Sequence, residues 1–188
     1  MTKQGFLILI ITVIALSCKT TTKLTPTQSN TNPQYIFPID WIGHYKGDLN
    51  ILGAQNDTIS VIMELIIDYP DAMGLYPWVL KYDEKDVRYY GLEVVDATRG
   101  HYRIDEHNGI KLDAYLRSNH LITDFEVVGN HLIFHYEKKT DGIAIQVYSS
   151  RASSYTTTGD EIIGKDTIPP VKSFPVTGYQ SGYLYKIK

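Results

Sequence analysis

The feature that most constrains the fold is a run of strand-length segments separated by short turns. In the first segment, from Ile39 to Ile51, apolar residues recur at every second position, which is the period of a half-buried strand. Similar segments follow at residues 59–67, 76–82, 87–95, 101–105, 110–116, 121–128, 131–137 and 143–149. Pairs such as Asn108-Gly109 and Asp141-Gly142 supply the backbone conformation that tight hairpins need. The sequence therefore predicts an all-β fold without a helix.

Short turns between successive strands make neighbouring strands antiparallel. Residues 150–175 are rich in Ser, Thr, Gly and Pro and predict a long loop, followed by a tenth strand from Tyr179 to Ile187. A meander of this length exposes two edges unless it closes on itself. We therefore expect residues 35–188 to form one antiparallel up-and-down barrel of about 8–10 strands. A two-sheet sandwich is the alternative, but it usually needs long crossovers.

The amino end has the pattern of an export signal. Lys3 is followed by an uncharged, mostly apolar run from Phe6 to Ser17, which is typical of a signal peptide over residues 1–17. The run is too short for a lasting transmembrane helix, which needs about 20 apolar residues. The sequence Ala15-Leu16-Ser17-Cys18 resembles a bacterial lipobox, in which the chain is cut before a lipidated Cys. An ordinary secretory signal that contains a Cys is the alternative.

The lipobox resemblance implies a chain that is attached to a membrane through lipidated (palmitate-bearing) Cys18. Residues 18–34 would then be a flexible tether, because residues 19–34 hold one large aliphatic residue and cannot bury a core. Some lipoproteins of the Bacteroidetes kind carry an acidic surface-export signal after the Cys, and residues 19–23 contain no acid. That resemblance implies a place in the bacterial cell envelope, in the outer membrane and facing the periplasm.

Composition excludes several classes of protein. The 18 Lys and Arg residues against 21 Asp and Glu residues give a formal charge of −3, so nucleic acid is not an expected partner. One Cys excludes a disulfide scaffold. The chain has no Gly-x-Ser-x-Gly elbow, phosphate-binding Gly loop, His-Glu-x-x-His or calcium loop. We therefore expect neither an enzyme nor a bound cofactor or metal.

The segment Trp41-Ile-Gly43-His-Tyr45-Lys-Gly47, followed by the meander, resembles calycin-like small barrels such as lipocalins and fatty-acid-binding proteins. In lipocalins the motif runs Gly-x-Trp, whereas here Gly43 follows Trp41. The resemblance implies structural roles for Trp41, Gly43 and Tyr45, and a late basic residue, Arg151 or Lys186, packed over Trp41. It also implies reversible binding of a small apolar or amphipathic molecule inside the barrel.

One group of aromatic and basic residues falls largely on the alternate strand positions that we expect to face the barrel interior. Arg88 shares that parity with Tyr90, where an unpaired charge would be costly, so a carboxylate ligand could pair with it. The alternative is that the aromatic residues only pack the barrel and Arg88 lies in water. The predicted ligand-binding residues are Trp78, Tyr82, Arg88, Tyr90 and Tyr102, with Tyr45 and Tyr136 in the same aromatic group.

Two other groups of residues suggest chemistry. Asp105, Glu106 and His107 could form an acid/base group, but the Asn108-Gly109 that follows favours a polar hairpin turn. His131 and His135 have a metal-like spacing, yet four residues of strand separate their Cα atoms by roughly 13 Å. They cannot easily share one metal ion.

The sequence is compatible with three functions. The first is a calycin-like envelope lipoprotein that binds a small hydrophobic or aromatic ligand. The second is an exported interaction module with a filled barrel that contacts another envelope protein. The third is a hydrolase built around Asp105, Glu106 and His107. An apolar hollow inside the barrel would separate the first from the second.

Overall fold

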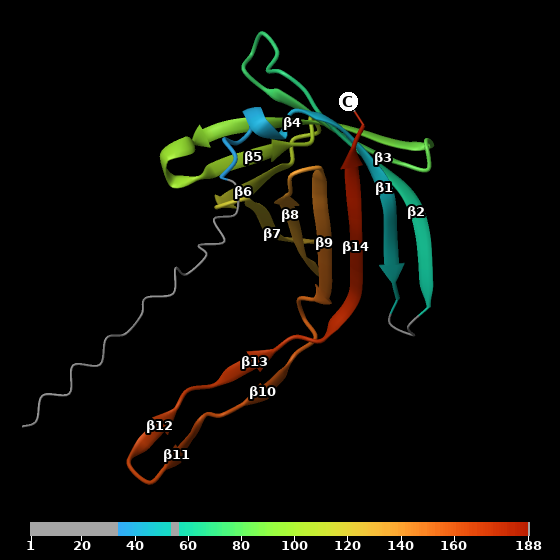
Figure 1. Cartoon of the computed structure of the whole chain (residues 1–188). Coiled ribbons are helices and arrows are strands. Elements are labelled where there is room, and N and C mark those ends of the chain that lie inside the picture. The colour runs from blue at the N-terminus through green and yellow to red at the C-terminus, as the bar shows by residue number, and fades with distance from the viewer. Residues whose placement is uncertain (1–33, 54–56, 188) are drawn as a thin grey trace, which may run out of the picture. The chain divides into compact units, whose positions relative to one another are not determined.

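The computed structural model describes residues 34–53 and 57–187, and these contain a closed barrel of ten antiparallel strands (Figure 1). No α-helix occurs in this part of the chain. The prediction of an all-β, closed antiparallel barrel is confirmed, and the arrangement is consistent with a calycin-like small barrel. The barrel strands are β1 (Gly43–Leu52), β2 (Thr58–Ile67), β3 (Tyr76–Tyr82), β4 (Asp86–Asp96), β5 (His101–Asp105), β6 (Lys111–Arg117), β7 (His120–Val127), β8 (Asn130–Lys138), β9 (Gly142–Arg151) and β14 (Val176–Lys186).

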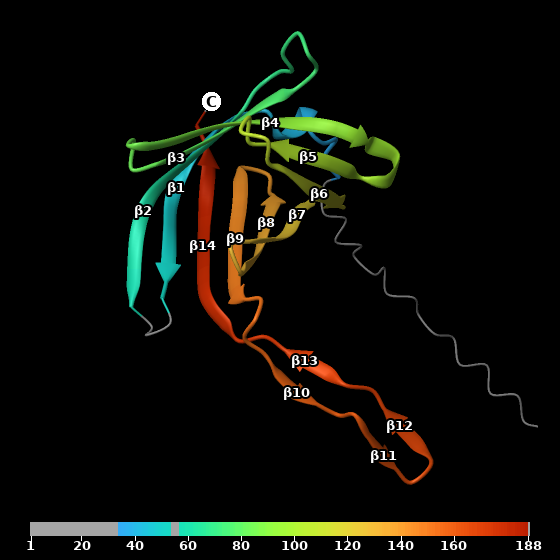
Figure 2. The same cartoon turned by 180° about the vertical axis from the view of Figure 1, so that it is seen from behind.

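Closure of the barrel depends on the pairing of the first strand with the last. β1 lies between β2 and β14, and β14 lies between β1 and β9, as Figure 2 shows from behind. Gly182 of β14 is opposite Leu49 of β1, and a Cβ at Gly182 would lie 2.6 Å from a backbone oxygen of β1. Glycine is therefore needed where the two strands approach. The closed order excludes the two-sheet sandwich.

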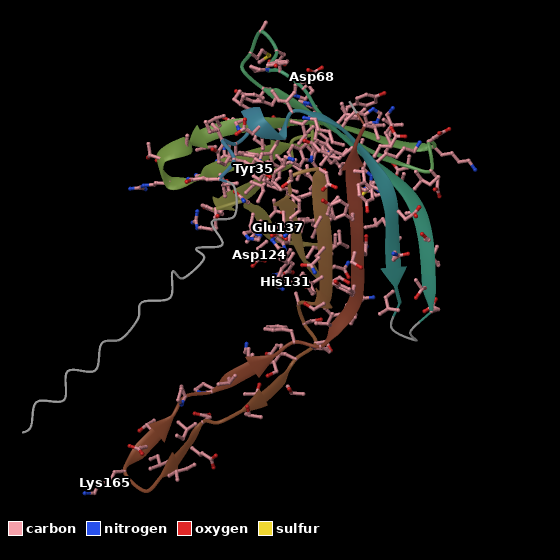
Figure 3. The ribbon with its side chains drawn as sticks, viewed as in Figure 1. Tyr35, Asp68, Asp124, His131, Glu137 and Lys165 are labelled. Atoms are coloured by element: carbon pink, nitrogen blue, oxygen red, sulfur yellow. The ribbon has the colours of Figure 1, made fainter. Side chains whose placement is uncertain are left out.

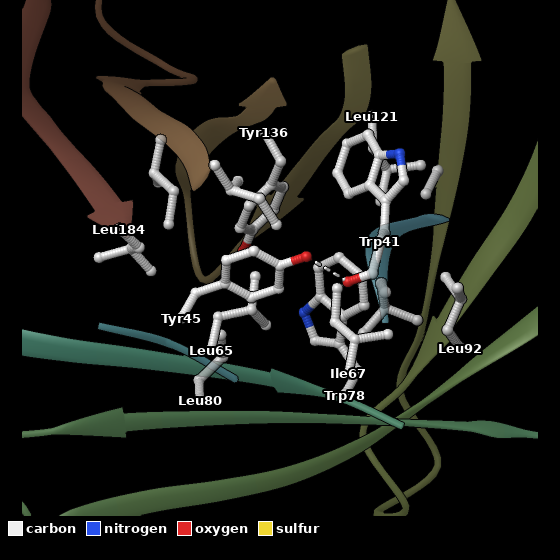
Figure 4. Packing of buried hydrophobic residues seen from close by; sticks show 14 of the residues in the cluster. Trp41, Tyr45, Leu65, Ile67, Trp78, Leu80, Leu92, Leu121, Tyr136 and Leu184 are labelled. Atoms are coloured by element: carbon white, nitrogen blue, oxygen red, sulfur yellow. Dashed lines mark hydrogen bonds between the residues drawn. The ribbon is translucent and has the colours of Figure 1, made fainter. Parts of the chain in front are cut away.

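One end of the barrel is plugged by the segment that precedes β1. This plugged end holds the 3-10 turn η1 (Ile39–Trp41), whereas the sequence placed Trp41 within the first strand. The strand prediction was wrong there because apolar residues two positions apart, here Ile39 and Trp41, do not by themselves distinguish a strand from a 3-10 turn. Trp41 is fully buried and meets Phe37 edge-on, with ring centroids 4.9 Å apart. The Tyr45 hydroxyl donates a hydrogen bond to the Trp41 carbonyl at 2.7 Å (Figure 4).

The opposite end carries the β3–β4, β5–β6 and β7–β8 hairpin turns, and we call it the hairpin end. Inward-facing side chains form the core of the barrel. Leu65 of β2, for example, is opposite both Tyr45 and Leu80, and all three are buried. The core is therefore continuous across β1, β2 and β3.

The long loop predicted for residues 150–175 is instead a strand ribbon. It forms two short ladders, β10 (Thr156–Thr158) with β13 (Val171–Ser173) and β11 (Glu161–Ile163) with β12 (Asp166–Ile168). The sequence prediction was wrong because both faces of this ribbon are mostly exposed, so no alternation of apolar and polar residues marks it. A second 3-10 turn, η2 (Ala97–Arg99), connects β4 to β5. In the described residues no helix is long and apolar enough to cross a membrane.

Candidate functional site

A hollow of about 210 Å³ lies inside the barrel, bounded by β3 to β8. Its lining residues share one face of the sheet, because Trp78 is opposite Tyr90 and Thr123 is opposite Phe134 in the strand register. That face is the inner one, which also carries the buried Leu80. The lining consists of Trp78, Leu80, Tyr82, Arg88, Tyr90, Ile104, Glu106, Leu112, Thr123, Phe125, Val127, Leu132, Phe134 and Tyr136.

Four of the five predicted ligand-binding residues lie around this hollow. Trp78, Tyr82, Arg88 and Tyr90 line it, on β3 and β4. Tyr102 does not line it: its ring is buried and meets Phe37 at a centroid distance of 4.6 Å, on the plugged side of the core. The structure therefore brings four of these side chains together, and their role in binding stays a prediction.

Arg88 has a partner that the sequence reasoning did not assign. Its Nη2 donates to Asp86 Oδ2 at 2.7 Å, and its Nε lies 3.2 Å from the same oxygen. The Asp86 carboxylate raises the pKa of Arg88 further above its ordinary value. The guanidinium also lies over the Tyr82 ring, 5.1 Å from its centroid. Both Arg88 and Asp86 are about half exposed, so the pair lies at the hairpin end rather than in the core.

The deeper wall of the hollow is aromatic. Tyr136 of β8 is buried and meets Trp78 edge-on, with centroids 5.4 Å apart. Burial raises the pKa values of Tyr136 and Tyr82, because the charged phenolate loses solvation. The pKa of Tyr90 is raised first by burial and then by the negative charge of Glu106. These hydroxyls therefore stay protonated and can donate hydrogen bonds to a ligand.

The wall formed by β6, β7 and β8 was missed by the sequence reasoning. Leu112, Phe125 and Phe134 belong to it, and each has the inward parity of its own strand. That parity was available from the sequence. Which strand faces which across the hollow depends on the barrel register, and the sequence does not specify it.

The Asp105–Glu106–His107 group forms the β5–β6 turn. The Asp105 carboxylate accepts the backbone N–H of His107 at 2.8 Å and pairs with Lys111 at 3.1 Å, and both contacts lower its pKa. Glu106 lines the interior hollow, whereas His107 lines a separate hollow of about 180 Å³ on the outer face beside Tyr89. Glu106 therefore faces away from the other two, and the three side chains do not converge on one cavity.

The two histidines of β8 contact side chains of the neighbouring strand and do not contact each other. His131 lies beside Asp124 of β7 (Figure 3), and His135 Nε2 is 2.8 Å from His120 Nδ1. The His120–His135 pair was not foreseen, because the two residues are 15 positions apart in the chain. In the part of the chain that the structure describes, no group of three or more His, Cys, Asp or Glu residues could hold a metal ion.

The basic residues at the plugged end pack over Tyr45. Lys186 Nζ lies 5.8 Å from the Tyr45 ring centroid and Lys138 Nζ lies 5.5 Å from it. Lys138 is buried and donates to the Lys139 carbonyl at 2.6 Å, and burial lowers its pKa. Of the two basic residues expected near Trp41, Lys186 reaches this end and Arg151 is exposed at the end of β9.

Gly43 starts β1 with an extended backbone, directly after Trp41 and Ile42. Cys18 and the predicted signal and tether, residues 1–33, lie outside the described residues. Comparison with known proteins finds no matching family model, no similar curated protein and no similar solved structure.

Proposed function

We propose that this chain is a lipid-anchored protein of the bacterial envelope whose barrel binds a small hydrophobic or aromatic molecule without catalysis. The observation that carries the proposal is the hollow of about 210 Å³ between β3 and β8. A barrel serving only as a scaffold would gain dispersion energy by filling such a space. A hollow with aromatic walls and a few polar groups at one end is the common form of a small-molecule site.

The size of the hollow limits the ligand. An engineered apolar cavity of about 150 Å³ in another protein holds benzene, whereas sites for drug-sized ligands measure roughly 300–1,000 Å³. At about 210 Å³, this hollow fits a molecule with one ring or two fused rings. Long fatty acids do not fit unless side chains move.

Binding of a neutral ring tests the proposal. We expect indole to bind the purified full-length chain in isothermal titration calorimetry, with the same buffer and lipid or detergent as a blank. Leu112→Trp places a larger side chain in the hollow and should abolish binding. Ile133→Trp, on the outward parity of β8, is the matched control and should bind indole as the unmodified chain does. The proposal fails if the unmodified chain gives no heat above the blank.

Membrane attachment rests on the sequence alone: a short apolar run, Ser17, and Cys18 as the only Cys. Two or more lipid chains hold a protein firmly, whereas one chain binds only marginally. The parent chain should carry added lipid mass and fractionate with bacterial membranes, and Cys18→Ala should lose the mass and shift toward the soluble fraction. Equal fractionation without lipid mass on the parent would contradict lipidation.

The interaction module remains the second candidate because the ribbon between β9 and β14 exposes apolar side chains. An isolated two-stranded ribbon is marginally stable in water, so a partner surface would stabilise it. A photo-crosslinker at Ile162 should capture a specific envelope protein in cells if this candidate is correct, and no adduct would count against it. The exposed side chains are those of Tyr155, Ile162, Ile163, Val171 and Phe174.

A further inference from the structure

One carboxylate of the barrel lacks the partner that its equivalents have. Six acidic residues of the described part are buried or half-buried: Glu64, Glu93, Asp96, Asp105, Glu106 and Glu137. Five of them lie within 4 Å of a Lys, Arg or His nitrogen. Glu106 has no such ion pair within residues 34–53 and 57–187. Desolvation of an unpaired carboxylate is unfavourable, so the exception is informative.

Glu106 lies where a ligand would meet it. It follows β5 directly, and its side chain lines the aromatic hollow at the hairpin end. The polar contact of its carboxylate is with the Asn108 amide, which donates to Oε2 at 3.2 Å. Tyr90, whose ring lines the same hollow, lies near enough for the Glu106 charge to raise the pKa of its hydroxyl.

The cation of the hollow is already neutralised. Arg88 directs Nε and Nη2 at Asp86 in a two-point contact, the arrangement by which guanidinium groups bind carboxylates. The Arg88–Asp86 pair therefore contributes little net charge beside the hollow, whereas Glu106 adds a negative charge to the lining that no ion pair of the described residues neutralises. A ligand carboxylate would have to share Arg88 with Asp86 and approach the negative charge of Glu106.

We propose that the hollow takes a small aromatic amine, with its ring between the walls of β3 and β8 and its ammonium at Glu106. The inference rests on the proposed function and names the class of its ligand. An ammonium would supply the charge-assisted hydrogen bond that Glu106 lacks. Trp78 and Tyr90 line the same hollow, and aromatic rings of this kind attract an ammonium through cation–π contacts. An amine ligand replaces the carboxylate-bearing ligand that an unpaired Arg88 would have favoured.

Three probes that share one ring and differ in charge test the proposal: tryptamine, indole and indole-3-acetate. Each is titrated into the purified full-length chain at pH 7 by calorimetry, against the blank described above. We expect tryptamine to bind about tenfold more tightly than indole, the size of one charge-assisted hydrogen bond in a partly exposed site. Indole-3-acetate should bind more weakly than indole. The tryptamine preference should decrease with added salt.

Two variants assign the preference to its residue. Glu106→Gln keeps the shape of the side chain but removes its charge, so tryptamine and indole should bind this variant equally. Glu126→Gln removes an exposed carboxylate of β7 and should leave the preference intact. Asp86→Asn frees Arg88 and should strengthen the binding of indole-3-acetate.

The outcomes separate the two proposals. If none of the three probes binds, the proposed function itself fails. If indole binds and indole-3-acetate binds at least as tightly as tryptamine, the hollow is a ligand site and the amine inference is overturned. A tryptamine preference that persists in Glu106→Gln also overturns it. The ranking in the unmodified chain decides the matter even if a variant does not fold.

Discussion

The plugged end and the hairpin end of this barrel are built from the same kinds of side chain and differ in what occupies the space between them. At the plugged end Phe37 and Trp41 enter the core from the segment before β1, and the Tyr45 hydroxyl closes onto the Trp41 carbonyl. At the hairpin end no segment of the described chain enters, and a hollow of about 210 Å³ remains. The comparison indicates that aromatic residues of one end pack the core, whereas those of the other end line a hollow.

The largest expected effect is on the plugged end. Trp41→Ala removes a fully buried indole and should lower the free energy of unfolding by about 3–5 kcal/mol. Tyr90→Ala, at the half-buried wall of the hollow, should cost less than about 1.5 kcal/mol, since little packing is lost beside an existing space. Urea unfolding followed by circular dichroism measures both. Similar losses in the two variants would remove the distinction between the ends.

A second prediction compares paired and unpaired carboxylates. Glu64 on the outer face of β2 is buried and lies 2.9 Å from Lys46 and 2.7 Å from His44, which lower its pKa. Glu64→Gln should therefore destabilise the fold by about 1–2 kcal/mol, given that Lys46 is partly exposed. Glu106→Gln should leave stability unchanged or slightly raised, because no ion pair is lost.

The pH dependence of stability tests the ion pairs of Glu64. Because the folded pKa of Glu64 is depressed, its contribution is present above the unfolded value of 4.5 and is lost as the pH falls through the folded pKa. Unfolding midpoints between pH 7 and pH 3 should thus decline less steeply in Glu64→Gln than in the parent. A parallel decline in both chains would contradict the assignment.

The smallest expected effect concerns one hydrogen bond of the plugged end. Tyr45→Phe loses the bond to the Trp41 carbonyl and should cost about 1 kcal/mol at neutral pH. Burial raises the pKa of Tyr45 to about 12, so the parent loses stability as the pH rises from 10 toward 12. Tyr45→Phe should lose less stability than the parent over this pH range, as measured by urea unfolding. Identical stability profiles between pH 10 and pH 12 in the two chains would contradict this prediction.

The sequence predicts the strands well because alternation is a local signal. It predicted all ten barrel strands and their order, whereas Trp41 lies in a turn and residues 156–173 form a ribbon. Those two differences arise where local alternation either imitates a strand or is absent. Closure by β1 and β14 depends on long-range register, which the sequence implies only through the cost of exposed edges.

Part of the candidate site was predictable because alternation along a strand shows which side chains share a face. Inward parity selects Trp78, Tyr82 and Tyr90 from their own strands. The Asp86–Arg88 pair was also readable, since residues two apart on a strand share a face. The lack of an ion pair at Glu106 was not predictable from the sequence. It depends on the positions of basic residues on other strands, such as Lys111, which pairs with Asp105 instead.

The most direct test of the account is a crystal structure of the chain soaked with 5-bromoindole, with the bromine located by its anomalous signal. We expect one dominant bromine site inside the barrel, with the ring between Trp78 and Phe134, and loss of that site in Leu112→Trp. Bromine only on the outer face, for example beside His107 and Tyr89, or no ordered bromine at all, would contradict a ligand site within the barrel.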